Sequence, residues 1–286
     1  MASLDRPELD TPRQGRPSHL DDHAYITRAR LSALYSEAAE AYEDLWAPEL
    51  LPLTRELLPH LRLDEARRVL EVGAGVGLLL PELEALAPQA GIVACDLAFG
   101  MLRRAPEGFC RAVMDAEHLA LKDETVDVGL LAFVLFHLVE PEQGIAEMAR
   151  VLRSGGFVGA TTWGDENEPV SYQVWDHELD RHGAPPPDPD FACFEEVDTP
   201  GKVEDLMMSH GIRPVRSWVG EYRATPTPDQ FIAHRIGHGR SRQRVQPIPE
   251  EVRIRCLRDA RERLKALTPD AFEEIADVVY VVGQKV

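Results

Sequence analysis

Three glycines and an acid are closely spaced in the segment "EVGAGVG", residues 71–77. A glycine-rich turn after a buried strand lets the backbone approach a ligand, and the dinucleotide-binding fingerprint of this kind is G-x-G-x-x-G. Position 78 is a leucine and no lysine follows, so both a dinucleotide loop and a phosphate-binding loop are disfavoured. Glu71 would repel a pyrophosphate but suits a ligand with an ammonium or hydroxyl groups.

Two further acids follow at regular intervals. Asp96 ends the apolar run "GIVACD", 19 residues beyond Gly77, and Asp115 in "AVMDAEHL" comes another 19 residues later. A carboxylate at the end of the second strand can accept hydrogen bonds from both ribose hydroxyls. One at the end of the third strand can accept a hydrogen bond from an adenine amino group. Three neighbouring strand ends are thus predicted to present acids to one nucleoside ligand.

The segments "EVGAGVG", "ACDL", "MDAEHL" and "LAFVLFHLVEPEQGIAEMARVLRSGGF" together resemble the class I S-adenosylmethionine-dependent methyltransferases. The closest group is the broad small-molecule one that includes enzymes of ubiquinone and menaquinone biosynthesis. The resemblance covers about residues 35–163, and beyond residue 163 it is only architectural. It implies S-adenosyl-L-methionine as methyl donor and S-adenosyl-L-homocysteine as product.

The resemblance also implies the donor-binding residues. The glycine loop would approach the methionine part, with Glu71 at its amino end. Asp96 would hold the ribose and Asp115 the adenine amino group, while Tyr35 and Tyr42 would fold over the donor from an N-terminal helix or else be core aromatics. The full predicted set is Tyr35, Tyr42, Glu71, Gly73, Ala74, Gly75, Gly77, Asp96, Leu97, Met101, Asp115, Ala116, Glu117 and Phe133.

A histidine is the candidate catalytic group. By the resemblance, His137 and Phe133 line the reacting end of the donor. Methyl transfer to oxygen or nitrogen often requires removal of a proton, for which a side chain with a pKa near neutrality is suited. We predict that His137 is a general base; the alternative is that it only shapes the pocket or holds the loop before Pro141.

Aromatic residues gather around residues 163–194 and predict an apolar acceptor pocket, with core packing as the alternative. They are Trp163, Tyr172, Trp175, Phe191 and Phe194. The same region, residues 165–198, holds eleven acids against one arginine, whereas residues 235–265 hold ten basic residues against four acids. These two segments favour acceptors of opposite charge, or are simply solvated, so the acceptor's charge stays open.

Other histidines have weaker claims. His177, Glu178 and His182 lie on one predicted helix and either face a substrate or, as we favour, face solvent in the main. His234 and His238 have the spacing of metal ligands, but no acidic or cysteine partner lies within that stretch. No metal site is predicted.

These groups require an α/β scaffold. After two helices within residues 24–60, short apolar runs alternate with helical patterns, which predicts a parallel sheet with helices on both faces. We predict a Rossmann-like, seven-stranded, mostly parallel sheet whose last strand is antiparallel. Its predicted parts are a mobile leader (1–23), the donor-binding core (24–163), an α-helical lid from insertions after strands 5 and 6 (164–199 and 225–270), and the final helix and strands (200–224 and 271–286).

Composition excludes several partners. The net charge of −18 disfavours nucleic acid, and no apolar stretch is long enough to span a membrane. Residues 1–23 lack a secretory signal, and the four cysteines form no CxxC pattern, so a cytoplasmic location is expected. A monomer or homodimer is expected.

The sequence therefore predicts an S-adenosylmethionine-dependent methyltransferase. The methyl group would pass to oxygen, nitrogen or carbon, with oxygen slightly favoured, of a small, partly apolar metabolite, in a setting such as bacterial secondary metabolism. The alternatives are a protein that binds the donor without transferring its methyl group, such as a cyclase or a binding partner, and, less favoured, a nicotinamide oxidoreductase.

Overall fold

The computed structural model describes residues 19–188 and 194–286. Of the predicted leader, residues 1–18 lie outside the described part, while residues 19–23 already belong to the first helix, α1 (His19–Ala41). The aromatic candidate Phe191 and the cysteine Cys193 also lie outside the described residues.

One seven-stranded sheet forms the centre of the molecule, with strand order β3-β2-β1-β4-β5-β7-β6. Neighbouring strands from β3 to β5 are parallel, and β7 is antiparallel to both β5 and β6, which confirms the predicted fold class. The strands are β1 (Arg68–Val72), β2 (Gly91–Asp96), β3 (Cys110–Val113), β4 (Val126–Ala132), β5 (Leu152–Glu166), β6 (Ile212–Ala224) and β7 (Glu274–Lys285).

The central strands are buried because helices cover both faces of the sheet. In β1 the four residues from Val69 to Val72 are buried, and β4 is buried at five of its seven positions. Burial at nearly every position is typical of parallel strands covered on both sides, and here the buried run of β1 includes the acid Glu71. The edge strand β6 instead alternates between exposed and half-buried positions along most of its length.

Helices between the strands complete the α/β layers. They are α3 (Leu80–Leu86), α4 (Phe99–Leu102), α5 (Pro141–Val151) and α7 (Pro200–Ser209). On the N-terminal side, α1 continues into a π-helical turn (Tyr42–Trp46) and then α2 (Ala47–Arg55). The sequence predicted two helices here but not the π turn. The first and last residues of this turn, Tyr42 and Trp46, line a large cavity.

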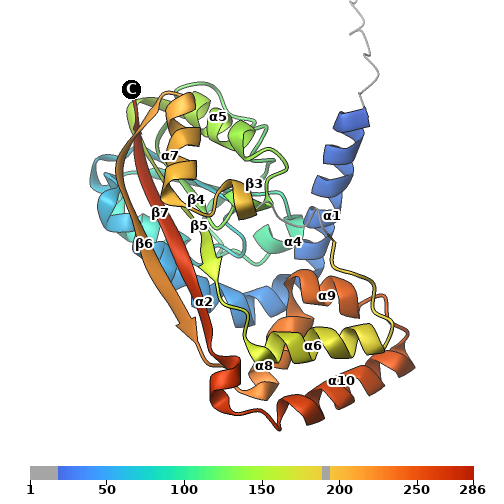
Figure 1. The fold of residues 1–286 in the computed structure, drawn as a ribbon. Helices are drawn as coiled ribbons and strands as arrows, with labels where there is room; N and C mark the ends of the chain where they lie inside the picture. The colour runs from blue at the N-terminus through green and yellow to red at the C-terminus, as the bar shows by residue number, and fades with distance from the viewer. Residues whose placement is uncertain (1–18, 189–193) are drawn as a thin grey trace, which may run out of the picture.

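A second group of helices lies beyond the carboxyl ends of the parallel strands (Figure 1). This helical group consists of α6 (Val170–Arg181), α8 (Pro228–Gly237), α9 (Gly239–Val245) and α10 (Glu250–Leu264). It reaches that edge because β5 and β6 run in the same direction and lead directly into α6 and α8. The group has a hydrophobic core of its own, separate from that of the sheet.

No helix in the part of the chain described by the structure has the length and apolarity needed to cross a membrane.

Candidate active site

The glycine loop after β1 adopts a conformation that only glycine tolerates well. Gly73, Gly75 and Gly77 have φ angles of +68°, +55° and +70°. A Cβ on Gly73 would lie 2.2 Å from Val134 Cγ2. The backbone N–H of Ala74 donates a hydrogen bond of 2.9 Å to the carbonyl of Cys95, which ties the loop to β2. The loop is therefore held close to the strand ends.

Asp96, at the end of β2, organises this loop. Its carboxylate accepts hydrogen bonds from the backbone N–H of Gly75 at 2.8 Å and of Ala98 at 2.7 Å. Burial raises the pKa of Asp96, and these backbone donors oppose that shift by favouring the charged form. The same side chain lines the cleft at the strand ends, so Asp96 both fixes the loop and faces the space beside it.

Glu71 is a buried acid whose hydrogen-bonding capacity is not fully used. Its side chain is 5% exposed, and Oε2 has no hydrogen-bond partner among the described residues. Burial, with a contribution from the charge of Asp96, raises the pKa of Glu71 to about 8. A cationic or hydrogen-bond-donating ligand would satisfy this oxygen and favour the charged form.

The strand-end cleft has a volume of about 90 Å³ and contains the predicted adenosine-binding residues. It is lined by Gly73, Asp96, Leu97, Asp115, Ala116 and Glu117, and also by residues of α1 and by His137. Arg28 of α1 lies across it, with Nε 3.1 Å from Asp115 Oδ2 and a second ion pair to Glu117. The helix α1 thus covers the cleft and supplies a cation beside its acids.

The residues present fit the adenosyl donor that the resemblance implies. The unsatisfied Glu71 oxygen suits an ammonium group, and at Gly75 the atom nearest to an added Cβ is Tyr42 Cε1 at 3.6 Å, so a ligand can approach the backbone closely there. Asp96 and Asp115 face one cleft from neighbouring strands.

Some predicted donor-binding residues have other surroundings. Met101 is 1% exposed and packs in a small core with Val76 and Ala98, so it supports the loop and does not line the cleft. Gly77 faces Ala105 and Leu80, where a Cβ would lie 2.8 Å from each. Neither residue lines the strand-end cleft; both pack closely beneath the loop, and their direct contact with the donor stays a prediction.

Glu117 does line the strand-end cleft, but its carboxylate is fully engaged. It accepts a hydrogen bond of 2.7 Å from the backbone N–H of Val139 and pairs with Arg28. Its side chain is 1% exposed. The acid therefore holds the segment after His137 in place.

A cavity of about 350 Å³ lies between the strand ends and the helical group. Tyr35 and His137 line both this large cavity and the strand-end cleft. Tyr42 and Phe133 line both the large cavity and a smaller cleft beside Glu71 and Gly73. These four residues, all predicted from the sequence, therefore form the boundary between the loop and the cavity.

Aromatic rings form much of the wall near this boundary. Phe133 has a φ of +56°, a strained backbone conformation for a bulky residue, and its ring centroid lies 4.8 Å from that of Trp163. The predicted pocket residues Trp163, Tyr172 and Phe194 line the cavity. Trp175 does not: it is 1% exposed within the core of the helical group, where its Nε1 donates to Ser241 Oγ at 3.2 Å. For Trp175, core packing is the correct interpretation.

Two histidines meet at the boundary. The hydroxyl of Tyr35 lies 2.5 Å from His137 Nε2. The ring centroids of Tyr35 and His238 are 4.6 Å apart, and burial, with smaller effects of His137 and Arg242, lowers the pKa of His238 to about 3. His238 Nδ1 has no hydrogen-bond partner among the described residues. His238 is thus a neutral group with an unused nitrogen at the cavity.

Sequence reasoning missed His238 as a site residue. Its only signal was the spacing to His234, which was considered for a metal. Its position between α8 and α9 brings it to the cavity through the packing of the helical group on α1, which no local pattern reveals.

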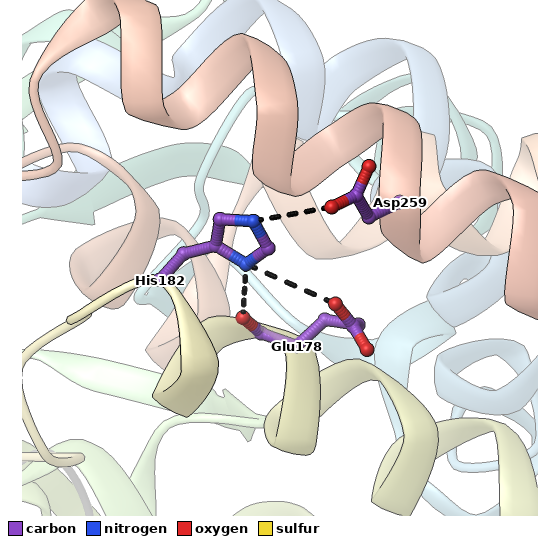
Figure 2. A group of neighbouring side chains, drawn as sticks. All are labelled: Glu178, His182 and Asp259. Carbon is purple, nitrogen blue, oxygen red and sulfur yellow. Dashed lines mark hydrogen bonds and ion pairs between the residues drawn. The ribbon is translucent and has the colours of Figure 1, made fainter.

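A cluster of potential metal ligands lies elsewhere, between α6 and α10 (Figure 2). The ligand atoms of Glu178, His182 and Asp259 lie within 4.8 Å of one another. However, Glu178 already pairs with Arg181 at 3.0 Å and with Arg263 at 2.8 Å, and these cations compete with any metal ion. The cluster therefore joins the two helices.

The prediction for this helix is corrected in part. His177 is exposed, as expected, but Glu178 is completely buried and His182 donates from Nδ1 to the carbonyl of Glu178 at 2.8 Å. Its Nε2 lies 3.4 Å from Asp259.

Comparisons with known proteins agree with this geometry. Residues 70–159 match the model of a methyltransferase domain family. The chain is 35% identical over 128 residues to the malonyl-acyl-carrier-protein O-methyltransferase of Geobacter sulfurreducens, covering 42% of this chain and 48% of that protein. It is 26% identical to the enzyme of the same name from Dechloromonas aromatica, over 91% of this chain and 95% of that protein.

Solved structures share the fold. A candidate methyltransferase from Bacillus halodurans C-125 is similar with a TM-score of 0.54 at 16% identity, over 81% of this chain and 98% of that one. The (4+2) cyclase SpnF is similar with a TM-score of 0.51 at 17% identity, over 82% and 80% of the two chains. Residues 70–159 thus form a methyltransferase domain, and the described chain has the Rossmann-like fold of the class I S-adenosylmethionine-dependent methyltransferases.

Proposed function

We propose that the protein transfers a methyl group from S-adenosyl-L-methionine to an oxygen atom of a small, partly apolar metabolite. One observation carries the proposal. The clefts at the glycine loop and the acidic strand ends share the boundary formed by Tyr35, Tyr42, Phe133 and His137 with a cavity of about 350 Å³. A volume of this size fits a small-molecule acceptor.

The donor would be held by residues of the core. Glu71 would bind its ammonium group, Asp96 its ribose, and Asp115 with Ala116 its adenine. The donor supplies a methyl group activated on a sulfonium. Because Tyr35 and His137 face both spaces, this part of the boundary would receive the sulfonium end.

The protein's contribution to the reaction would be alignment, exclusion of water and proton removal. His137 is the proposed base for an acceptor hydroxyl. His238 is too weakly basic to remove that proton, but its neutral Nδ1 could accept a hydrogen bond and orient the hydroxyl. The aromatic wall from Phe133 to Trp163 would keep water from the reacting atoms.

We also propose that the helical group acts as the substrate cap predicted from the insertions. It supplies cavity-lining residues from α6, α8 and α9. The names of the two O-methyltransferase relatives support oxygen as the acceptor atom.

The test uses deuteromethyl-labelled donor with a bacterial metabolite extract, followed by mass spectrometry. We expect a labelled product that forms in step with S-adenosylhomocysteine. Tight donor binding without any labelled product would contradict methyl transfer and favour a cyclase or binding role.

A further inference from the structure

The large cavity has two chemically different ends. Near the glycine loop its walls are aromatic, and the residues there are shared with the two smaller clefts. Tyr172, Arg235 and Glu274 also line the large cavity, but none of them lines those clefts. A molecule spanning the cavity would therefore present its apolar part to the donor and a polar part to Arg235.

Arg235 lies against two aromatic rings but is poorly paired. Its guanidinium carbon lies 3.5 Å from the ring centroid of Tyr172 and 5.1 Å from that of Phe231. Its Nε is buried and has no hydrogen-bond partner in the described part of the chain. The closest acid in an ion pair with it, Glu274, is 3.8 Å away, beyond hydrogen-bonding distance. A stacked guanidinium with unused donors is suited to binding a planar anion.

Of the three acids that line the cavity with Arg235, Asp176 is paired elsewhere and Glu274 is held less charged, whereas Glu166 adds a negative charge. Asp176 pairs with Arg244 at 2.7 Å, and Arg244 also pairs with Asp180. Burial raises the pKa of Glu274, which accepts a hydrogen bond from the Tyr172 hydroxyl. Glu166 lines the same cavity. These acids repel a doubly charged phosphate more strongly than a singly charged carboxylate, so they favour the latter.

We propose that the acceptor carries a carboxylate that binds Arg235 over the face of Tyr172. This inference rests on the proposed function and adds a substrate class to it. Because Arg235 lines neither of the clefts beside the glycine loop, this carboxylate is a recognition group and a different atom of the acceptor receives the methyl group.

The test measures binding without methyl transfer. Trp46 and Trp163 line the cavity, so quenching of tryptophan fluorescence reports its occupation. The probes are 3-phenylpropionate and octanoate, their primary amides, and 2-phenylethyl phosphate, each titrated into protein saturated with S-adenosylhomocysteine. In the wild type at least one carboxylate binds about tenfold or more tightly than its amide, the scale of a lost charge-assisted hydrogen bond, and more tightly than the phosphate.

Variants assign the preference to Arg235. In Arg235→Gln the carboxylate and amide bind within about twofold of each other, whereas Arg235→Lys retains part of the preference because it retains the charge. Arg261→Gln is the matched control, since Arg261 is exposed and, in the described part of the chain, pairs with exposed Asp229. S-adenosylhomocysteine titration confirms that each variant is folded.

Equal binding of amide and carboxylate, tighter binding of the phosphate, or a preference that survives in Arg235→Gln would overturn the inference. So would failure of both carboxylates to bind a protein that binds S-adenosylhomocysteine. Loss of the preference with intact label transfer contradicts this inference alone. A preserved preference without label transfer contradicts the proposed function alone.

Discussion

Glu71 is the proposed partner of the donor's ammonium group, so its charge is expected to change when the donor binds. Its pKa of about 8 reflects burial, and a bound ammonium would lower it. Donor binding therefore releases a proton from Glu71 below pH 8, and the affinity for S-adenosylhomocysteine rises between pH 6 and 8, by at most about tenfold per pH unit. Calorimetry in buffers of different ionisation enthalpy measures both effects.

Glu71→Gln is the control, because it removes the titrating group while leaving the amino group of the ligand. Any pH dependence of the affinity that remains in Glu71→Gln arises from titration of the ligand. An identical proton release in wild type and Glu71→Gln would exclude Glu71 as the partner of the ammonium.

Asp96 fixes the glycine loop and is proposed to bind the ribose, and Asp96→Asn alters both interactions. The asparagine keeps one acceptor oxygen for the loop but loses the charge that strengthens hydrogen bonds from ribose hydroxyls. We expect S-adenosylhomocysteine affinity to fall by about 1.5 to 3 kcal/mol. Asp127→Asn, which alters an acid bonded to the backbone N–H groups of Arg67 and Arg68, is a control outside the clefts. Unchanged calorimetric affinity in Asp96→Asn would remove the ribose assignment.

His137 is expected to affect turnover and not donor binding. His137→Ala should lower kcat by about 100-fold, the lower end of general-base catalysis, with S-adenosylhomocysteine affinity within about twofold. Tyr35→Phe removes only the hydroxyl that contacts Nε2 and should cost less. Initial rates with the acceptor found by label transfer provide the measurement; full activity of His137→Ala would exclude it as the base.

At the scale of elements, the turn after β1 is the most constrained segment. Gly73→Ala combines a positive φ with a contact of 2.2 Å to Val134, so we expect the free energy of unfolding to fall by about 2 to 4 kcal/mol. Gly183→Ala has a similar φ of +75° and nothing within 4 Å of the added Cβ. It should cost only the backbone part, about 1 kcal/mol. Urea denaturation measures the free energy of unfolding of both variants. Equal losses for Gly73→Ala and Gly183→Ala would show that Val134 moves away from the added Cβ at little cost.

The pair α6 and α10 depends on Glu178. Replacing it by alanine leaves Arg181 and Arg263 without their shared partner, but both are about half exposed and can turn to water. The expected loss in the free energy of unfolding is therefore about 1 to 3 kcal/mol, below the cost of stranding a fully buried charge. Asp229→Asn, in an exposed pair, should change it by less than about 1 kcal/mol. Urea denaturation measures both variants. Equal losses in the free energy of unfolding for Glu178→Ala and Asp229→Asn would show that the buried Glu178 ion pairs do not hold α6 and α10 together.

Much of the element pattern was predictable because it is local. The buried runs of β1 and β4 and the glycines of the loop are set by residues close in sequence, so their type and order followed from periodicity and spacing. The π turn at Tyr42–Trp46 was not predictable in this way, because its residues also suit an ordinary α-helix.

At the scale of the whole molecule, the site depends on two cores that meet across one cavity. The donor-side acids belong to the sheet, whereas Arg235 and His238 belong to the helical group. Trp175 could not be placed from the sequence, because a tryptophan suits a pocket wall and a core equally well. The packing of α6 on α8 buries it in the core of the helical group. Residues brought together over long sequence separations leave no local signal of which face they occupy.

Donor and acceptor are predicted to meet at the boundary formed by Tyr35, Tyr42, Phe133 and His137. A crystal structure with S-adenosylhomocysteine tests it most directly. We predict the amino end at Glu71, the ribose at Asp96, the adenine at Asp115, and the sulfur facing the large cavity beside His137. A sulfur atom that faces away from this cavity, or an adenine bound outside the strand-end cleft, would contradict the account.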